Sequence, residues 1–202
     1  VSDPALVAHW ALDETEGIVA HDSSGDNDAD IIGDPVWQPD GGVVAGALQF
    51  DGLDDHVCTD CVLNPANGAF SALAWIKGGS AGQVILSQNR GTDWLMADPL
   101  DGTLRTDLKN PGSTGRGATP PGPPLISPVI ITDGNLHRVG FVWDGSSRIL
   151  CVDRIEVARD NADNLESAYG CLYIGAGGTL EPGTYFSGMI DDVHIYNRGV
   201  RP

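Results

Sequence analysis

The sequence predicts an all-β fold, a two-sheet antiparallel β-sandwich of the jelly-roll type. Three observations indicate it. Short segments with an apolar residue at every second position recur along the chain. Asp-Gly pairs, which favour reversals between strands, follow several of these segments, and no segment has the spacing of a long amphipathic helix. With 202 residues and 41% hydrophobic residues, the chain can form one domain, residues 1–202, around a single core.

Ten segments carry the strand pattern: 6–12, 47–50, 70–76, 83–88, 103–108, 137–143, 148–152, 155–159, 171–174 and 189–196. Between them, segment 161–168 has the length of one helical turn at most. Segment 110–128 is rich in Gly, Pro and Ser, so we expect a surface loop or a binding rim there. Its lack of any aromatic residue weakens the second interpretation.

Charge excludes two classes of partner. The formal net charge is −17, and most of the 28 acidic residues are aspartate. Such a field repels phosphate backbones and anionic lipid surfaces, so we expect no nucleic-acid partner. We also expect no membrane insertion, because no apolar stretch approaches the roughly 18 residues of a membrane span. The chain begins at Val1 rather than Met, so we expect a processed chain or a part of a larger protein with neighbouring domains.

Four cysteines leave three interpretations open. An even number in a chain with secreted character favours disulfides, and we expect Cys58 paired with Cys61 and Cys151 paired with Cys171. A four-thiolate zinc site is the second interpretation, although the latter two cysteines lack the close C-x-x-C spacing of such sites. Free thiols are the third.

The segment HDSSGDNDAD concentrates oxygen-bearing side chains around a glycine. Short carboxylates and amides in a tight loop can wrap a Ca²⁺ ion with side-chain and carbonyl oxygens. Farther along, Asp191 has the same alternation parity as Val193 and Ile195, which places its carboxylate on the apolar face of the last strand. A carboxylate on that face requires a partner, because its burial is otherwise costly.

Seven segments in order resemble a known family: HWALDETEG, HDSSGDNDADIIGDPVW, GALQFDGLDDHV, FSALAWIKGG, DGNLHRVGFVWDGSSRILCVD, LYIGAGG and YFSGMIDDVHIYNRGV. Together they cover nearly the whole chain and resemble the laminin-G-like jelly-roll domains of the concanavalin A-like lectin and glucanase superfamily. The sequence departs from the family where many relatives have Trp-His-His, because Leu136, His137 and Arg138 stand there. It also has Asp153-Arg154 where relatives often have Asp-Gly.

The resemblance implies two curved sheets, adjacent terminal strands and an extracellular setting, secreted or at the cell surface. It also implies a structural Ca²⁺ between the early loop and the last strand. Its ligands here would be Asp22, the Gly25 carbonyl, Asn27 and Asp191. The alternative is that Asp22 caps a turn while Asp191 accepts backbone hydrogen bonds.

Candidate sugar-binding residues lie near the predicted loops. Trp94 and Tyr185 are aromatic residues that could stack on a sugar ring, and Asn89, Arg90 and Asp93 carry groups that could bind hydroxyls. The alternative role of the polar residues is a solvated rim.

Catalysis has no sequence support. Glycosidases of this fold use a Glu-x-Asp-x-x-Glu strand, which is absent, and the close pair Glu14 and Glu16 lies in a turn. No histidine accompanies a Ser or Cys nucleophile motif. We therefore expect a non-catalytic, calcium-stabilised module that binds a glycan or another extracellular surface polymer. The alternative is a structural or adhesive subunit that self-associates into a homo-oligomer or filament.

Overall fold

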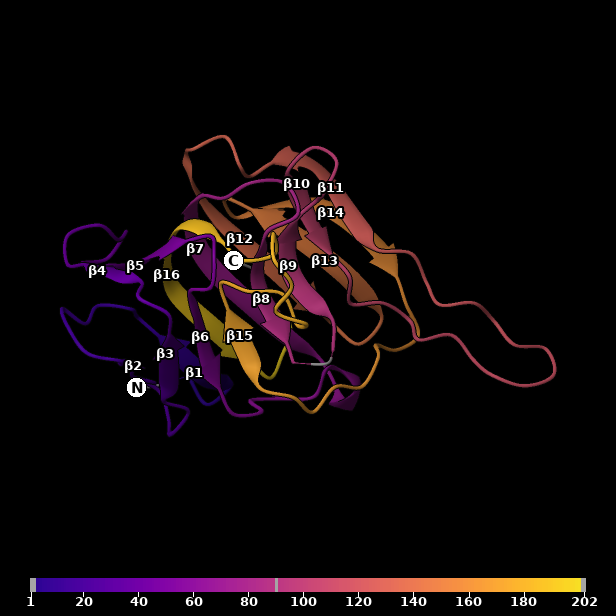
Figure 1. Ribbon diagram of the computed structural model, residues 1–202. Helices are drawn as coiled ribbons and strands as arrows, with labels where there is room; N and C mark the ends of the chain where they lie inside the picture. Colours follow the sequence, from indigo (N-terminus) through magenta and orange to yellow (C-terminus); the bar gives the residue numbers. More distant parts are fainter. Residues whose placement is uncertain (1–2, 90, 201–202) are drawn as a thin grey trace.

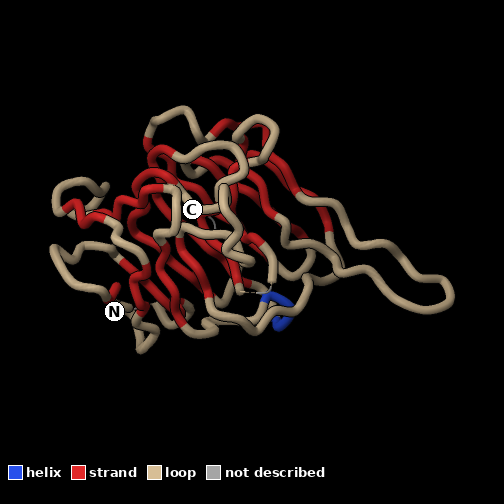
Figure 2. The backbone as a smooth tube through the Cα atoms, in the orientation of Figure 1, coloured by secondary structure: helices blue, strands red, loops and turns tan. Residues whose placement is uncertain are grey.

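The computed structural model describes residues 3–89 and 91–200, and the strands of this part of the chain form two antiparallel sheets (Figures 1 and 2). The first sheet has the order β14-β13-β12-β7-β16-β5-β4, and β1 also pairs with β16. Its strands are β1 (Leu6–Trp10), β4 (Val36–Gln38), β5 (Ala47–Asp51), β7 (Phe70–Gly78), β12 (Leu136–Trp143), β13 (Ser147–Val152), β14 (Ile155–Asn161) and β16 (Ser187–Tyr196).

The second sheet has the order β11-β10-β9-β8-β15-β6-β3-β2. Its strands are β2 (Val19–Ala20), β3 (Ala29–Ile32), β6 (His56–Thr59), β8 (Val84–Gln88), β9 (Asp93–Ala97), β10 (Thr103–Thr106), β11 (Leu125–Ile130) and β15 (Leu172–Ile174). A 3-10 turn, η1 (Pro65–Asn67), precedes β7. The described residues form no helix with the length and apolarity that crossing a membrane requires. The predicted all-β sandwich is confirmed.

The core lies between the sheets and follows strand alternation. In β7, Phe70, Ala72, Ala74 and Ile76 belong to one buried cluster that also contains residues of the second sheet, such as Leu86. Each large apolar side chain removed from water in this way contributes about 1.5–3 kcal/mol. Alternation therefore fixes which face of each strand turns inward.

β16 is the strand that joins the two ends of the chain. It pairs with β7 along one side. Along the other side it pairs first with β5 and then with β1. A register shift against β7 lies between Asp191 and His194, and Asp192 has a φ of 52°. This bulge lies where β16 changes partner from β5 to β1. The pairing of β1 with β16 makes the N-terminal and C-terminal strands neighbours, as the family resemblance implies.

All ten predicted strands are present with shifted ends, and six others were missed: β2, β3, β4, β6, β9 and β11. Most of these are short, so alternation over two to four residues carries little signal. β11 lies partly within segment 110–128, which we expected to be irregular. The remaining loop between β10 and β11 projects from the body of the molecule (Figures 1 and 2).

Candidate functional site

An open hollow of about 760 Å³ lies at one end of the second sheet. Three stretches line it: the residues after β6, the turn after β8, and the segment that leads into β15. The lining residues are Asp60, Cys61, Asn89, Ser167, Ala168, Tyr169, Gly170 and Cys171. Because β6, β15 and β8 are adjacent strands, their ends bring these stretches together although they are far apart in sequence.

Buried hydrogen bonds fix the walls of this hollow. The fully buried side chain of Gln88 donates from Nε2 to the carbonyl oxygens of Leu63 (3.0 Å) and Gly170 (3.1 Å). Asn64 caps η1, the blue turn in Figure 2, and donates from Nδ2 to Ser167 Oγ at 2.9 Å. A buried side-chain amide that bonds two loops holds both in one arrangement, so the hollow is preformed.

Gly170 allows the loop before β15 to lie directly on the turn after β8. The backbone N–H of Asn89 donates to the Cys171 carbonyl at 2.8 Å. A Cβ atom on Gly170 would lie 2.1 Å from the Asn89 carbonyl oxygen, which no side chain permits. The close approach of these two backbones therefore requires glycine at this position.

Tyr169 gives the hollow its distinctive chemistry. Its side chain is 75% exposed, and it is the single aromatic residue among the exposed large hydrophobic residues of the described chain. Beside it lie the amide of Asn89, the carboxylate of Asp60 and the hydroxyl of Ser167. An aromatic ring next to hydrogen-bonding groups matches a sugar ring, which has apolar C–H faces and polar edges.

The two aromatic residues predicted to bind sugar are placed elsewhere. Trp94 on β9 is completely buried, with its ring centroid 5.1 Å from that of Phe70, so its predicted contact with a sugar is wrong. Tyr185 is only 9% exposed, and its hydroxyl donates to the Leu180 carbonyl at 3.3 Å. Both rings are packed within the protein and leave no open face for stacking.

The three polar residues predicted to bind sugar hydroxyls differ in their positions. Asn89 lines the hollow as predicted. Asp93 accepts a hydrogen bond from the Gly178 N–H at 3.1 Å, and burial raises the pKa of its carboxyl. Arg90 lies outside the described residues. Tyr169 was not among the predicted sugar-binding residues, although a lone aromatic residue between Ala168 and Gly170 in a polar stretch was a signal for it.

Asp22 organises a turn. Its Oδ1 accepts hydrogen bonds from His9 N (2.9 Å), Ser24 N (2.9 Å) and Ser24 Oγ (2.8 Å). Its Oδ2 accepts from the backbone N (3.1 Å) and the Nδ2 (2.8 Å) of Asn27. The predicted residues Asp22 and Asn27 thus lie together, with Gly25 between them in the same turn. Five donors already fill both oxygens of this carboxylate.

Asp191 is buried as predicted, but its neighbours come from another loop. Its Oδ2 accepts from Val43 N at 2.6 Å, while its Oδ1 is buried without a hydrogen-bond partner. Burial raises the pKa of Asp191 to about 6, against the lowering effect of the Val43 N–H and with a further rise from Asp192 and Asp13. Among the described residues, no group of His, Cys, Asp or Glu side chains close enough to bind one metal ion together contains both Asp191 and Asp22.

These placements bear on the expected Ca²⁺ ion. A hard cation requires oxygen ligands with free lone pairs. The orphaned Asp191 Oδ1, with the Asp13 carboxylate near enough to raise the Asp191 pKa, fits this requirement. The Asp22 oxygens fit it poorly, because N–H and O–H groups occupy them.

The predicted pairing of Cys151 with Cys171 is wrong for this fold. Cys151 lies on β13 of the first sheet, in a small cluster with Val142 and Ile149 that is separate from the main core. Cys171 leads into β15 of the other sheet, and its thiol contacts that of Cys58. Burial, followed by this contact, raises the pKa of Cys58 to about 11. Cys61 is an exposed thiol at the hollow, not bonded to Cys58.

Comparisons with known proteins agree with this architecture. The family model for the concanavalin A-like lectin/glucanases superfamily matches residues 50–202, and the chain belongs to that family. No curated protein matches the sequence.

Three solved structures have the same fold. The binding domain of Paraclostridial Mosquitocidal Protein 1 aligns with a TM-score of 0.73 and 11% identity, over 97% of this chain and 49% of that chain. Domain 4 of AbnA, an extracellular arabinanase of Geobacillus stearothermophilus, aligns in its complex with arabinotriose with a TM-score of 0.63 and 16% identity, over 96% and 93% of the two chains. Trypanosoma rangeli sialidase in complex with sialic acid aligns with a TM-score of 0.65 and 16% identity, over 99% and 32%. The chain thus spans about half of the first of these proteins and a third of the sialidase.

Proposed function

We propose that this domain is a non-catalytic carbohydrate-binding module that takes an oligosaccharide, or a stretch of surface polymer, in the hollow beside Tyr169. The observation that carries the proposal is the exposed tyrosine ring next to an amide, a carboxylate and a hydroxyl in a preformed hollow. The arabinotriose complex of an arabinanase domain with this fold, aligned over 93% of that domain, supports a sugar as the ligand class.

The chemistry of the lining favours binding over turnover. Hydrolysis of a glycosidic bond by the usual route requires two carboxyl groups flanking the bond. Asp60 is the one carboxylate among the described lining residues of this hollow. The sialidase alignment covers 32% of that chain, so it carries no argument for sialidase activity here.

The setting and the stabilising ion are part of the same proposal. The proposal includes an extracellular location, secreted or at the cell surface, where a domain that binds glycans or surface polymers would meet its ligand. A structural Ca²⁺ would use the free oxygen of Asp191 and the Asp13 carboxylate, as the residue chemistry allows.

Self-association is the competing function. The edge strand β11 exposes Ile126 and Ile130, which could meet a second copy of the chain. Pro128 lies between them and has no N–H to donate, so a strand of a second copy would form fewer hydrogen bonds with this edge. The structure therefore gives assembly through β11 less support than binding at Tyr169.

Calorimetric titration with a panel of oligosaccharides that includes arabinotriose and sialyl-lactose tests the proposal. We expect at least one sugar to bind the wild type, and Tyr169→Ala to bind it about tenfold more weakly, which corresponds to about 1.4 kcal/mol. Leu100→Ala is the matched control, since Leu100 is 92% exposed on the turn after β9, and should bind normally. Light scattering of the same samples shows whether the protein self-associates instead. Failure of every sugar, or undiminished binding by Tyr169→Ala, would overturn the proposal.

A further inference from the structure

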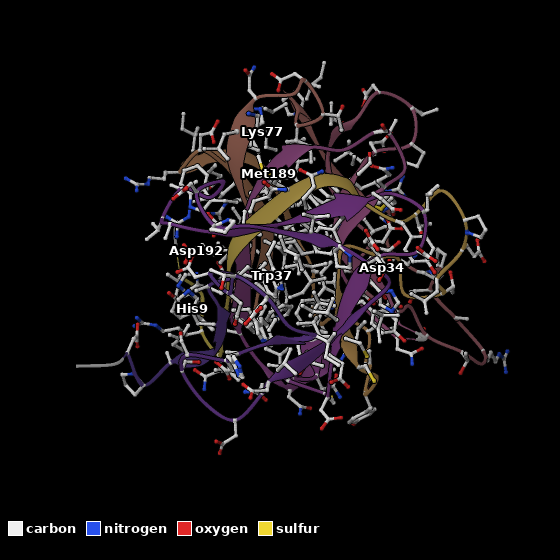
Figure 3. The ribbon with its side chains drawn as sticks, turned by 60° about the vertical axis from the view of Figure 1, so that its left-hand side comes forward. His9, Asp34, Trp37, Lys77, Met189 and Asp192 are labelled. Atoms are coloured by element: carbon white, nitrogen blue, oxygen red, sulfur yellow. The ribbon has the colours of Figure 1, made fainter. Side chains whose placement is uncertain are left out.

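Two histidines and an aspartate meet on the outer face of the first sheet, away from the hollow. His9 on β1 and His194 on β16 are directly paired residues of neighbouring strands. Their rings are stacked with centroids 3.9 Å apart and an interplanar angle of 18°. Asp192 lies beside both, with its Oδ1 2.8 Å from His9 Nε2 and its Oδ2 3.7 Å from His194 Nδ1. Figure 3 shows His9 and Asp192 close together on one side of the molecule.

The strand pairing creates this cluster. His9 belongs to the first strand of the chain and Asp192 to the last. The family resemblance implies that these strands are neighbours but does not indicate which of their residues are paired. The bulge in β16 turns Asp191 into the protein, while Asp192 and His194 keep their side chains on the outer face. One potential ligand atom from each residue lies within 4.8 Å of the others.

A neighbouring hydroxyl orients the first ring. Ser23 Oγ lies 2.6 Å from His9 Nδ1, in the turn that Asp22 organises. Without an ion, Nε2 donates to Asp192 Oδ1 and Nδ1 accepts from Ser23 Oγ. When an ion takes the place of the Nε2 proton, the ring proton lies on Nδ1 and is donated to Ser23. Metal-binding histidines are typically oriented in this way, by a hydrogen bond from the ring nitrogen that does not bind the ion.

The charges of the cluster suit a cation. His194 Nδ1 lies 3.0 Å from the backbone carbonyl oxygen of Asp192, which can only accept a hydrogen bond, so Nε2 is the nitrogen of this ring that remains for an ion. The Asp192 carboxylate supplies the negative charge, with one oxygen near His9 and the other near His194. Arg138 is the opposing influence, because its positive charge repels an incoming cation.

We propose that His9, Asp192 and His194 form a binding site for a first-row divalent transition metal, Zn²⁺ foremost. Two imidazole nitrogens and one carboxylate oxygen are a donor set that zinc takes, whereas Ca²⁺ prefers oxygen ligands alone. The side chains of His9 and Asp192 are each 21% exposed, so an ion can enter from solvent and keep a water molecule as its fourth ligand. The bound ion would join the first and last strands of the domain.

This site is independent of the sugar-binding proposal and has its own test. The chelator-treated wild type is titrated with ZnCl₂ by calorimetry, and its unfolding temperature is measured with and without Zn²⁺. We expect one Zn²⁺ per chain and a rise in Tm, because an ion that binds only the folded state stabilises it. Co²⁺ added in place of Zn²⁺ should give visible absorption bands of a four-coordinate site, a readout that needs no variant.

Variants separate this cluster from adventitious histidine binding. His9→Gln, Asp192→Asn and His194→Gln should each bind Zn²⁺ at least tenfold more weakly. His137→Gln is the matched control, because His137 lies between the carboxylates of Asp133 and Asp153 yet has no second histidine, and it should keep normal affinity. Absence of Zn²⁺ binding and of Co²⁺ bands in the wild type would overturn the proposal. So would full affinity in Asp192→Asn and His194→Gln, or an equal loss in His137→Gln.

Discussion

The carboxylate of Asp22 accepts a hydrogen bond from the backbone N–H of His9 at 2.9 Å, across 13 residues of sequence. Asp22 also forms an isolated antiparallel bridge with Trp10, so the turn and the end of β1 are fixed together. Burial acts to raise the pKa of Asp22, but the hydrogen bonds from His9, Asn27 and Ser24 outweigh it and bring the pKa to about 2. The turn is thus built around an ionised carboxylate.

Replacing Asp22 by Ala should lower the free energy of unfolding by about 2 kcal/mol at pH 7, because each pKa unit of difference between folded and unfolded states is worth about 1.4 kcal/mol. The folded pKa lies below the unfolded value of 3.8, so this stabilisation is present above about pH 4 and is lost as the pH falls toward 2. Urea unfolding at pH 7 and pH 2 measures it. The exposed neighbour Asp26 provides the control Asp26→Asn, which should match the wild type, and equal stability of Asp22→Ala at pH 7 would contradict the prediction.

Alternation was sufficient to predict the two sheets and the burial of Asp191, since period-2 parity is a local property of the chain. It could not predict the partner of Asp191, because the Val43 N–H comes from a loop 148 residues away. Trp94 illustrates the same limit. It was expected near a loop, whereas pairing with β8 and β10 places its strand β9 inside the second sheet. The hollow at Tyr169 also depends on three distant stretches, which no single segment reveals.

Replacement by alanine should reduce stability strongly at Trp94 and hardly at all at Tyr169. Trp94→Ala empties a fully buried position against Phe70 and should cost about 3–5 kcal/mol of stability. Tyr169→Ala removes an exposed ring and should change stability by less than about 0.5 kcal/mol while weakening sugar binding. Chemical denaturation of the wild type and both variants at one pH measures these differences in the free energy of unfolding. A stable Trp94→Ala protein would show that the Trp94 ring does not lie in the core.

Oxidation should join Cys58 to Cys171. Their thiols are in contact, Cys58 on β6 and Cys171 directly before the neighbouring strand β15, whereas Cys151 lies in the other sheet. After mild oxidation by a disulfide reagent such as oxidised glutathione, peptide mapping by mass spectrometry should find the Cys58–Cys171 cross-link. Cys151→Ser should leave its yield unchanged, and Cys58→Ser should abolish it. Recovery of a Cys151–Cys171 peptide from folded protein would refute the placement of these strands.

Asp191 should determine the response of the domain to calcium. Its unpartnered buried oxygen costs about 1–3 kcal/mol when the carboxyl is ionised, and the cost vanishes when an ion or a proton binds. The folded pKa of about 6 lies above the unfolded value of 3.8, so metal-free stability should fall as the pH rises from about 4 to 6 and then level off. Asp191→Asn should therefore be more stable than the wild type at pH 8 in the presence of a chelator.

Added Ca²⁺ should raise the Tm of the wild type at pH 8 and leave that of Asp191→Asn unchanged, as measured by thermal unfolding. Asp34→Asn, which replaces an exposed aspartate, is the control and should respond to Ca²⁺ like the wild type. A wild-type Tm that does not change when Ca²⁺ is added at pH 8 would contradict the proposed calcium site at Asp191.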